Sequence, residues 1–165
     1  MLVVGIDPGT ATTGYGFLRE EAGKIDTLAY GVISTPAGLA DEKRLLLLYD
    51  QLRELFLLHQ PESGAVEKLF FQRNVSTAIA VGQARGIVML VFAQFGLRAG
   101  EYTPMEVKQA VSGYGGADKK QVQQMVKAIL GLEDIPRPDD AADALAVAIC
   151  HLNSYRYFSA GQEDR

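Results

Sequence analysis

The pattern of apolar and polar positions divides the chain into strand-like and helical segments. Residues 2–6 form an unbroken apolar run, which is typical of a central strand that is buried on both faces. Strand-like segments follow at residues 13–18 and 25–34, and the links between the three are so short that antiparallel pairing is expected. Apolar positions then recur at helical spacing over residues 41–58. This stripe comprises Leu45, Leu48, Leu52, Leu55 and Phe56.

The second half of the chain alternates between further strands and helices. Three antiparallel strands followed by such alternation predict an α/β fold with a five-stranded mixed sheet, three antiparallel strands and then parallel strands, flanked by helices. The remaining strands are expected at residues 64–70 and 97–102, and the remaining helices at residues 76–95, 104–111, 118–130 and 139–153.

Two of these helices carry local start signals. Pro104 suits the first turn of a helix, and Asp118 followed by Gln121 matches a capping box. We expect one domain over residues 1–154 and a flexible tail over residues 155–165.

Composition narrows the class of protein. The chain has 165 residues, of which 48% are hydrophobic and 22% charged, as expected for a globular domain. A formal net charge of −4 disfavours nucleic-acid binding by bulk charge but leaves room for a local basic face. Cys150 is the one cysteine, which excludes an internal disulfide and suits a reducing compartment. No signal peptide is visible and the apolar stretch 87–95 is too short to span a bilayer, so we expect a cytoplasmic protein without membrane contact.

Four acidic residues interrupt or border apolar segments. Asp7 ends the first apolar run, Glu67 lies inside the fourth strand, and Asp140 and Asp143 precede the apolar run 144–149. A buried carboxylate is costly unless it is paired or bound to metal. If the fold brings these segments together, their repulsion favours hard cations, so the pattern predicts a site for Mg²⁺ or Mn²⁺, with two ions per subunit, that acts on phosphate.

Each acid also has a purely structural interpretation. Asp7 is followed by Pro-Gly, which is turn chemistry. Glu67 would fit the polar face of an edge strand, Asp140 a helix N-cap, and Asp143 the favourable end of a helix dipole. The i,i+3 spacing of Asp140 and Asp143 puts them on one helix face, which favours a shared site. His59 and His151 show no metal-ligand spacing with each other, and each is expected at the surface or at a helix end.

The acidic segments and their surroundings resemble the RuvC family of bacterial Holliday junction resolvases. The resemblance covers nearly the whole chain up to the tail, and its specificity lies in the order of the motifs, since the first motif alone is weak. The motifs are Gly-Ile-Asp-Pro-Gly at residues 5–9 with Gly-Tyr-Gly at 14–16, Val-Glu-Lys-Leu-Phe at 66–70, Gly-Gln-Ala-Arg-Gly at 82–86, parts of 103–123, and Asp-Ala-Ala-Asp-Ala-Leu-Ala at 140–146.

The resemblance implies a ribonuclease H-like fold and a homodimer that clasps a four-way DNA junction. It implies symmetric nicking of two opposed strands to leave 5′-phosphates, and cooperation with the RuvA–RuvB branch-migration complex. Asp7, Glu67, Asp140 and Asp143 match the metal-binding catalytic acids of the family. Some members have histidine where this chain has Asp140, so a histidine general base is not available at that position.

DNA contacts are expected in two places. Lys108, Lys119 and Lys120 concentrate positive charge around a glycine-rich loop, and a lysine in the first turn of a helix opposes the helix dipole, which suggests an anionic partner. The alternative is an ordinary solvated helix face. The resemblance identifies Phe70 as a base-stacking side chain, with Phe71 turned to the core by strand alternation. Arg73 and Asn74 follow in the adjoining loop and could contact the DNA backbone or base edges.

Three other functions share part of this pattern. An actin- or Hsp70-type phosphate-binding ATPase also begins with Gly-x-Asp-x-Gly-Thr, but it needs a second lobe for which this chain is too short. A non-catalytic junction binder would gain nothing from carboxylates near phosphate. Another ribonuclease H-like nuclease, acting on RNA or on hybrids, would share the acids, and only the substrate would distinguish it.

Overall fold

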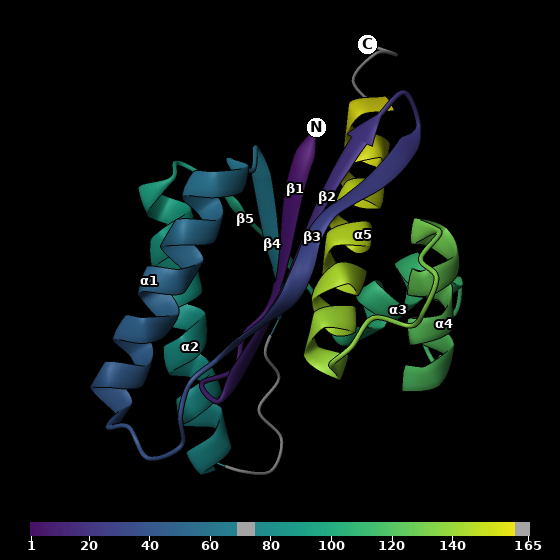
Figure 1. Ribbon diagram of the computed structural model, residues 1–165. Helices are drawn as coiled ribbons and strands as arrows, with labels where there is room; N and C mark the ends of the chain where they lie inside the picture. The colour runs from purple at the N-terminus through teal and green to yellow at the C-terminus, as the bar shows by residue number, and fades with distance from the viewer. Residues whose placement is uncertain (69–74, 161–165) are drawn as a thin grey trace.

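The predicted five-stranded mixed sheet is present in the computed structural model, which describes residues 1–68 and 75–160, except for the side chains of 75, 76 and 156–160. Its strand order is β3-β2-β1-β4-β5 (Figure 1). The first three strands pair antiparallel, while β4 is parallel to β1 and β5 is parallel to β4. The strands are β1 (Leu2–Asp7), β2 (Thr12–Glu21), β3 (Lys24–Ser34), β4 (Ser63–Glu67) and β5 (Ala99–Tyr102).

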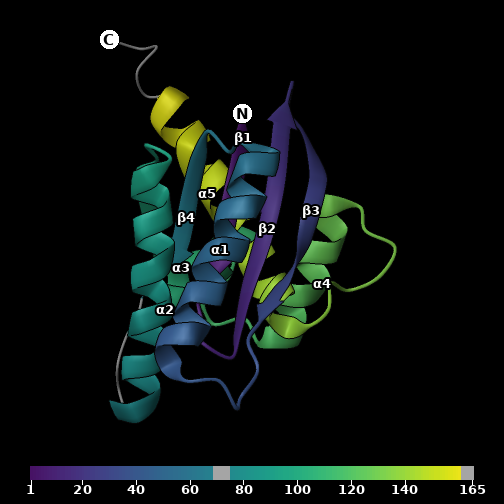
Figure 2. The ribbon, with the colours of Figure 1, turned by 60° about the vertical axis from the view of Figure 1, so that its left-hand side comes forward.

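Helices cover both faces of this sheet. One face packs against α1 (Asp41–His59) and α2 (Val75–Gln94), and Figures 1 and 2 show the other three helices on the opposite side. Those three are α3 (Pro104–Ser112), α4 (Lys119–Leu130) and α5 (Asp139–Ala160).

The central strand divides its side chains between the two layers. Leu2, Val4 and Ile6 belong to the core beneath α1 and α2, whereas Val3 belongs to the core beneath α5. Both faces of β1 are therefore buried, which confirms the interpretation of its unbroken apolar run.

Most predicted boundaries agree with the structure to within two residues, and the signals at the starts of α3 and α4 are confirmed. Asp118 accepts from the backbone N–H of Gln121, whose side chain accepts from the Asp118 N–H. The predicted end of the last helix near Asn153 was wrong, because α5 continues to Ala160. The Ser154 hydroxyl donates to the carbonyl of Cys150 and the ring of Tyr155 packs on His151, so the residues assigned to the start of a tail continue the helix.

Helix α5 lies unusually close to the sheet because two strand residues are glycines. A Cβ atom at Gly5 would collide with the carbonyl oxygen of Ala144, and one at Gly14 would collide with the carbonyl oxygen of Asp140. On the helix side the contact residues are also small, since Ala144 and Ala148 are fully buried. This close packing sets the first turns of α5 directly over the end of β1 and the start of β2.

Helix α2 is apolar on more than one face. Within the described residues, Thr77–Gln94 is the one helical segment that is long and apolar enough to cross a membrane by length and composition alone. This is weak evidence for a membrane span, because the core helix of a soluble protein passes the same test. Its residues Val88 and Phe92 are buried against the sheet, whereas Ile79 and Leu90 are exposed. One side of α2 thus belongs to the core, and an apolar outer side remains on the surface.

Candidate active site

Two of the four predicted acids end neighbouring parallel strands. In the register of β1 with β4, Ile6 lies opposite Val66, and Asp7 and Glu67 are the next residue of each strand. Side chains alternate along a strand, and Val3 and Ala65 both face the core beneath α5. Asp7 and Glu67 therefore turn toward the same side, at the carboxyl edge of the sheet where α/β proteins place their ligands.

The other two acids reach this edge through α5. Asp7 is the register partner of Gly14, and the backbone of Asp140 rests on Gly14. Asp143 follows one turn later on the same helix and is partly exposed, with 37% of its side chain accessible. Three segments that are far apart in the chain therefore bring their carboxylates together, as the sequence predicted.

The electrostatics of the site reflect this convergence. Burial, followed by the charges of Asp143, Glu67 and Asp140, raises the pKa of Asp7 from 3.8 to about 7. Burial also raises the pKa of Glu67 and of Asp143, and the Asp143 charge adds to the rise at Glu67. Such shifts mean that the carboxylates destabilise one another and that a cation among them would be favourable.

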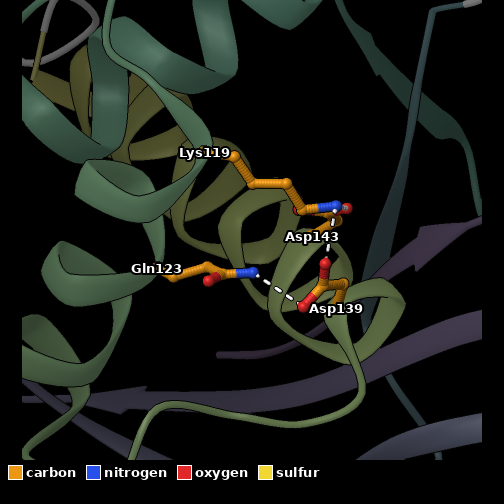
Figure 3. A network of polar contacts seen from close by, with 4 residues as sticks. All are labelled: Lys119, Gln123, Asp139 and Asp143. Carbon is orange, nitrogen blue, oxygen red and sulfur yellow. Dashed lines mark hydrogen bonds and ion pairs between the residues drawn. The ribbon is translucent and has the colours of Figure 1, made fainter.

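An ammonium group already stands beside these acids. The Lys119 Nζ lies 3.1 Å from Asp143 Oδ2 and 3.3 Å from Asp139 Oδ2. Figure 3 shows the Lys119 side chain reaching toward these two residues. Burial opposes the charge of Lys119, but its hydrogen bonds and ion pairs with Asp143 and Asp139 raise its pKa overall. The anionic partner expected for a lysine in this first helical turn is thus present within the protein itself.

Lys108 and Lys119 line a cleft that opens onto the acids. Both lysines oppose the rise in the pKa of Glu67, so they lie within electrostatic reach of it. The cleft has a volume of about 230 Å³ and is walled by α3, α4 and α5. Its lining residues are Glu67, Pro104, Val107, Lys108, Lys119, Val122, Asp143 and Ala146.

The donor set suits a hard divalent cation. Four carboxylates offer oxygen ligands without sulfur or nitrogen, which is the preference of Mg²⁺ and Mn²⁺. Among the residues that the structure describes, no three Asp, Glu, His or Cys side chains are already drawn together as a complete metal-binding group.

The other residues considered in the sequence lie in different places. Lys120 is exposed at the start of α4. Phe70, Arg73 and Asn74, like Phe71, lie outside the described residues. His151 was expected at the surface or at a helix end, and this was wrong, because it is 4% exposed within α5.

Sequence reasoning missed two polar side chains beside the site. Gln123 donates from Nε2 to Asp139 Oδ1 over 3.0 Å, whereas Asp139 was considered only as a helix start and Gln123 only as part of a matching segment. The spacing held a signal, since Lys119 and Gln123 are four residues apart, as are Asp139 and Asp143, and each pair shares a helix face.

Comparison with known proteins finds a family, relatives and solved structures that match nearly the whole chain. The family model described as crossover junction endodeoxyribonuclease RuvC matches residues 3–151. The crossover junction endodeoxyribonuclease RuvC of Syntrophomonas wolfei is 57% identical over 159 residues, which cover 96% of this chain and 92% of the relative. The Thermus thermophilus RuvC structure superposes with a TM-score of 0.87 at 38% identity, covering 95% of this chain and 96% of that one. T. thermophilus RuvC in complex with Holliday junction substrate gives a TM-score of 0.87 at 35% identity, with the same coverage of both chains.

Proposed function

The chain belongs to the crossover junction endodeoxyribonuclease RuvC family, and from this premise we propose that it resolves Holliday junctions in DNA recombination and repair by nicking two opposed strands. The observation that carries the proposal is the convergence of four carboxylates at one edge of the sheet, beside a cleft lined by two lysines. A four-way junction substrate is also supported by the T. thermophilus RuvC complex.

We assign the phosphodiester hydrolysis to Asp7, Glu67, Asp140 and Asp143, which would hold two ions of Mg²⁺ or Mn²⁺. Bound cations of this kind supply Lewis acidity that activates a water molecule and stabilises the leaving 3′-oxygen. The carboxylates would contribute hard ligands, and a cation bound among them would favour the ionised form of Asp7, whose pKa is raised to about 7 by burial and the neighbouring acids. Hydrolysis with a 3′-oxygen leaving group gives 5′-phosphate ends.

We assign the positioning of the DNA backbone to Lys108, Lys119 and Lys120. The first two line the cleft, so their charges would face a phosphate that enters it. Phe70, Arg73 and Asn74 belong to the segment that directly follows β4, and we propose them as contacts to bases and backbone at the junction.

We also propose that the protein acts as a homodimer. Two opposed strands need two sites, and a two-fold dimer supplies them in a symmetric arrangement. The outer side of α2 suits such an interface, because Ile79 and Leu90 are exposed and an added Cβ at Gly82 or Gly86 would meet nothing within 4 Å. We further propose cooperation with the RuvA–RuvB complex and a cytoplasmic location, which the family resemblance supports.

One experiment tests the central proposal. A synthetic four-way junction, a linear duplex, a fork and an RNA–DNA hybrid are incubated with the protein, and the cuts are mapped on each strand. We expect paired nicks on opposed strands of the junction with Mg²⁺ or Mn²⁺, and binding without cleavage with Ca²⁺, whose coordination geometry is looser. Full activity in EDTA would refute the metal assignment, and preferred cleavage of the hybrid would favour another ribonuclease H-like nuclease.

A further inference from the structure

Two pairs of polar side chains, one pair on α4 and one on α5, face each other beside the site. Lys119 and Gln123 are one turn apart on α4, and Asp139 and Asp143 are one turn apart on α5. The two pairs are joined by the two Lys119 ion pairs and by the hydrogen bond from Gln123 to Asp139 (Figure 3). Asp143 is among the acids assigned to the cation, whereas Asp139 has no role in the chemistry proposed above.

Asp143 is subject to two competing demands. Its Oδ2 accepts a hydrogen bond from Lys119 over 3.1 Å, yet a divalent cation would need the oxygens of the same carboxylate. The ammonium is therefore an internal competitor for that ligand. Asp139 offers the ammonium a second anionic acceptor at 3.3 Å. It is not one of the four acids assigned to the cation.

Gln123 fixes the orientation of the Asp139 carboxylate. The Asp139 side chain is 54% exposed, and an unrestrained carboxylate at that exposure would rotate among solvated conformations. The amide of Gln123 binds Oδ1 and leaves Oδ2 directed at Lys119.

We propose that Asp139, held by Gln123, is a positioning residue that shares the Lys119 ammonium with Asp143 and so frees Asp143 to take up a divalent cation. The inference rests on the proposed function, because it presumes that Asp143 is a cation ligand. When a cation occupies Asp143, the ion pair with Asp139 keeps Lys119 at the edge of the cleft, where it can meet a phosphate.

The test is a double-mutant cycle read out by Mn²⁺ affinity, measured by calorimetry on the DNA-free full-length protein. Asp139→Ala should weaken Mn²⁺ binding roughly three- to fivefold, because Lys119 then pairs with Asp143 alone. Lys119→Ala should tighten it by a similar factor, because the competitor is gone. In the Lys119→Ala background, Asp139→Ala should change the affinity by less than about twofold, since there is no ammonium left to share.

Control variants separate positioning from bulk charge. Asp139→Asn should behave like Asp139→Ala, Asp139→Glu should stay close to wild type, and Gln123→Ala should weaken Mn²⁺ binding in the same direction by a smaller factor. Asp134→Asn removes one exposed acid from the link before α5 and should leave the affinity unchanged. Circular dichroism verifies that every variant is folded.

Two outcomes would overturn the inference. An Asp139→Ala effect that persists undiminished in the Lys119→Ala background would mean that Asp139 acts only as a distant negative charge. Equal Mn²⁺ affinity in all four proteins of the cycle would mean that Lys119 does not compete for Asp143. Junction cleavage by the wild-type protein is assayed in parallel, so that a failure of the proposed function itself is seen separately.

Discussion

Helix α5 covers polar groups at both ends of strand β4, Glu67 at one end and Ser63 at the other, and the two ends differ in how those groups are satisfied. At the carboxyl edge of the strands, Asp7 and Glu67 face Asp143, and burial together with like charge raises the pKa of each of the two strand acids. Toward the other end, His151 Nε2 lies 2.6 Å from the Ser63 hydroxyl. Its Nδ1 lies 2.8 Å from the Tyr102 hydroxyl.

The difference separates a structural cluster from a functional one. A neutral imidazole has one donor and one acceptor nitrogen, and two hydroxyl groups complete both. The His151 cluster is thus satisfied within the protein and joins α5 to β4 and β5. The acidic cluster brings together groups of one charge, which become favourable only when a cation joins them. Similar burial therefore supports stability at one end of β4 and ligand binding at the other.

The largest expected effect comes from removing a carboxylate charge at the acidic end. Glu67→Gln or Asp143→Asn should reduce junction cleavage by more than the roughly 10- to 100-fold that the loss of an outer-shell partner costs. Junction binding in Ca²⁺ should persist, because the lysines of the cleft are unchanged and repulsion of phosphate falls. Single-turnover cleavage and a binding titration are compared, and normal cleavage by either variant would remove that acid from the metal site.

Truncation at the other end should show the reverse pattern. His151→Ala removes a buried side chain and leaves the hydroxyls of Ser63 and Tyr102 without their partner, so unfolding should become easier by about 2–4 kcal/mol. The enzyme that remains folded should still cleave junctions. The matched control is His59→Ala, a partly buried histidine at the end of α1, for which we expect about 1 kcal/mol or less. Denaturant unfolding measures both, and equal losses would contradict the structural role of His151.

The two ends should also respond to pH with opposite signs. Burial lowers the pKa of His151 from 6.5 to about 4, so the unfolded state binds more protons in this window and stability falls as pH drops through it. Burial and neighbouring acids raise the pKa of Asp7 from 3.8 to about 7, so the folded state binds more protons and stability falls as pH rises through that window. Each slope is at most about 1.4 kcal/mol per pH unit.

Difference curves isolate the two contributions. Unfolding free energy is measured in EDTA from pH 4 to pH 7 for wild type, His151→Gln and Asp7→Asn. Subtracting His151→Gln from wild type should give a curve that rises with pH, and subtracting Asp7→Asn should give one that falls. Curves of the same sign would show that one of the two sites does not titrate as its surroundings suggest.

The smallest effect is expected from removing the Lys119 charge beside the acidic end. Lys119→Ala should weaken junction binding equally for all sequences and reduce the slope of log affinity against log salt by about one unit. Lys24→Ala serves as the control, because this exposed lysine lies at the β2–β3 turn, at the end of the sheet near Met1 and away from the acids. An unchanged slope for Lys119→Ala would mean that its charge is used only within the protein.

Local pattern predicted the fold class and identified the four acids as candidates, whereas their assignment as metal-binding catalytic residues came from the family resemblance. The apolar run before Asp7, the short links between the first strands and the capping signals of α3 and α4 each depend on neighbouring residues, so they could be interpreted from the sequence. Asp7, Glu67, Asp140 and Asp143 were noticed because the cost of burying a carboxylate is a property of the residue itself, but the pattern gave their convergence only as a condition on the fold.

Other features depended on which elements pack together. The burial of His151 requires Ser63 and Tyr102 on two separate strands, and the pairing of Lys119 with Asp139 requires α4 to lie beside the start of α5. Near Asn153, where the sequence predicted the end of α5, the helix is held to α3, because the Asn153 side chain donates to the Ala110 carbonyl over 3.2 Å. The sequence by itself determined which residues carry costly charges and which segments form strands and helices. Only the tertiary structure decided which charges are neutralised inside the protein and which are left for a ligand, because partners from distant segments are chosen by packing and not by local pattern.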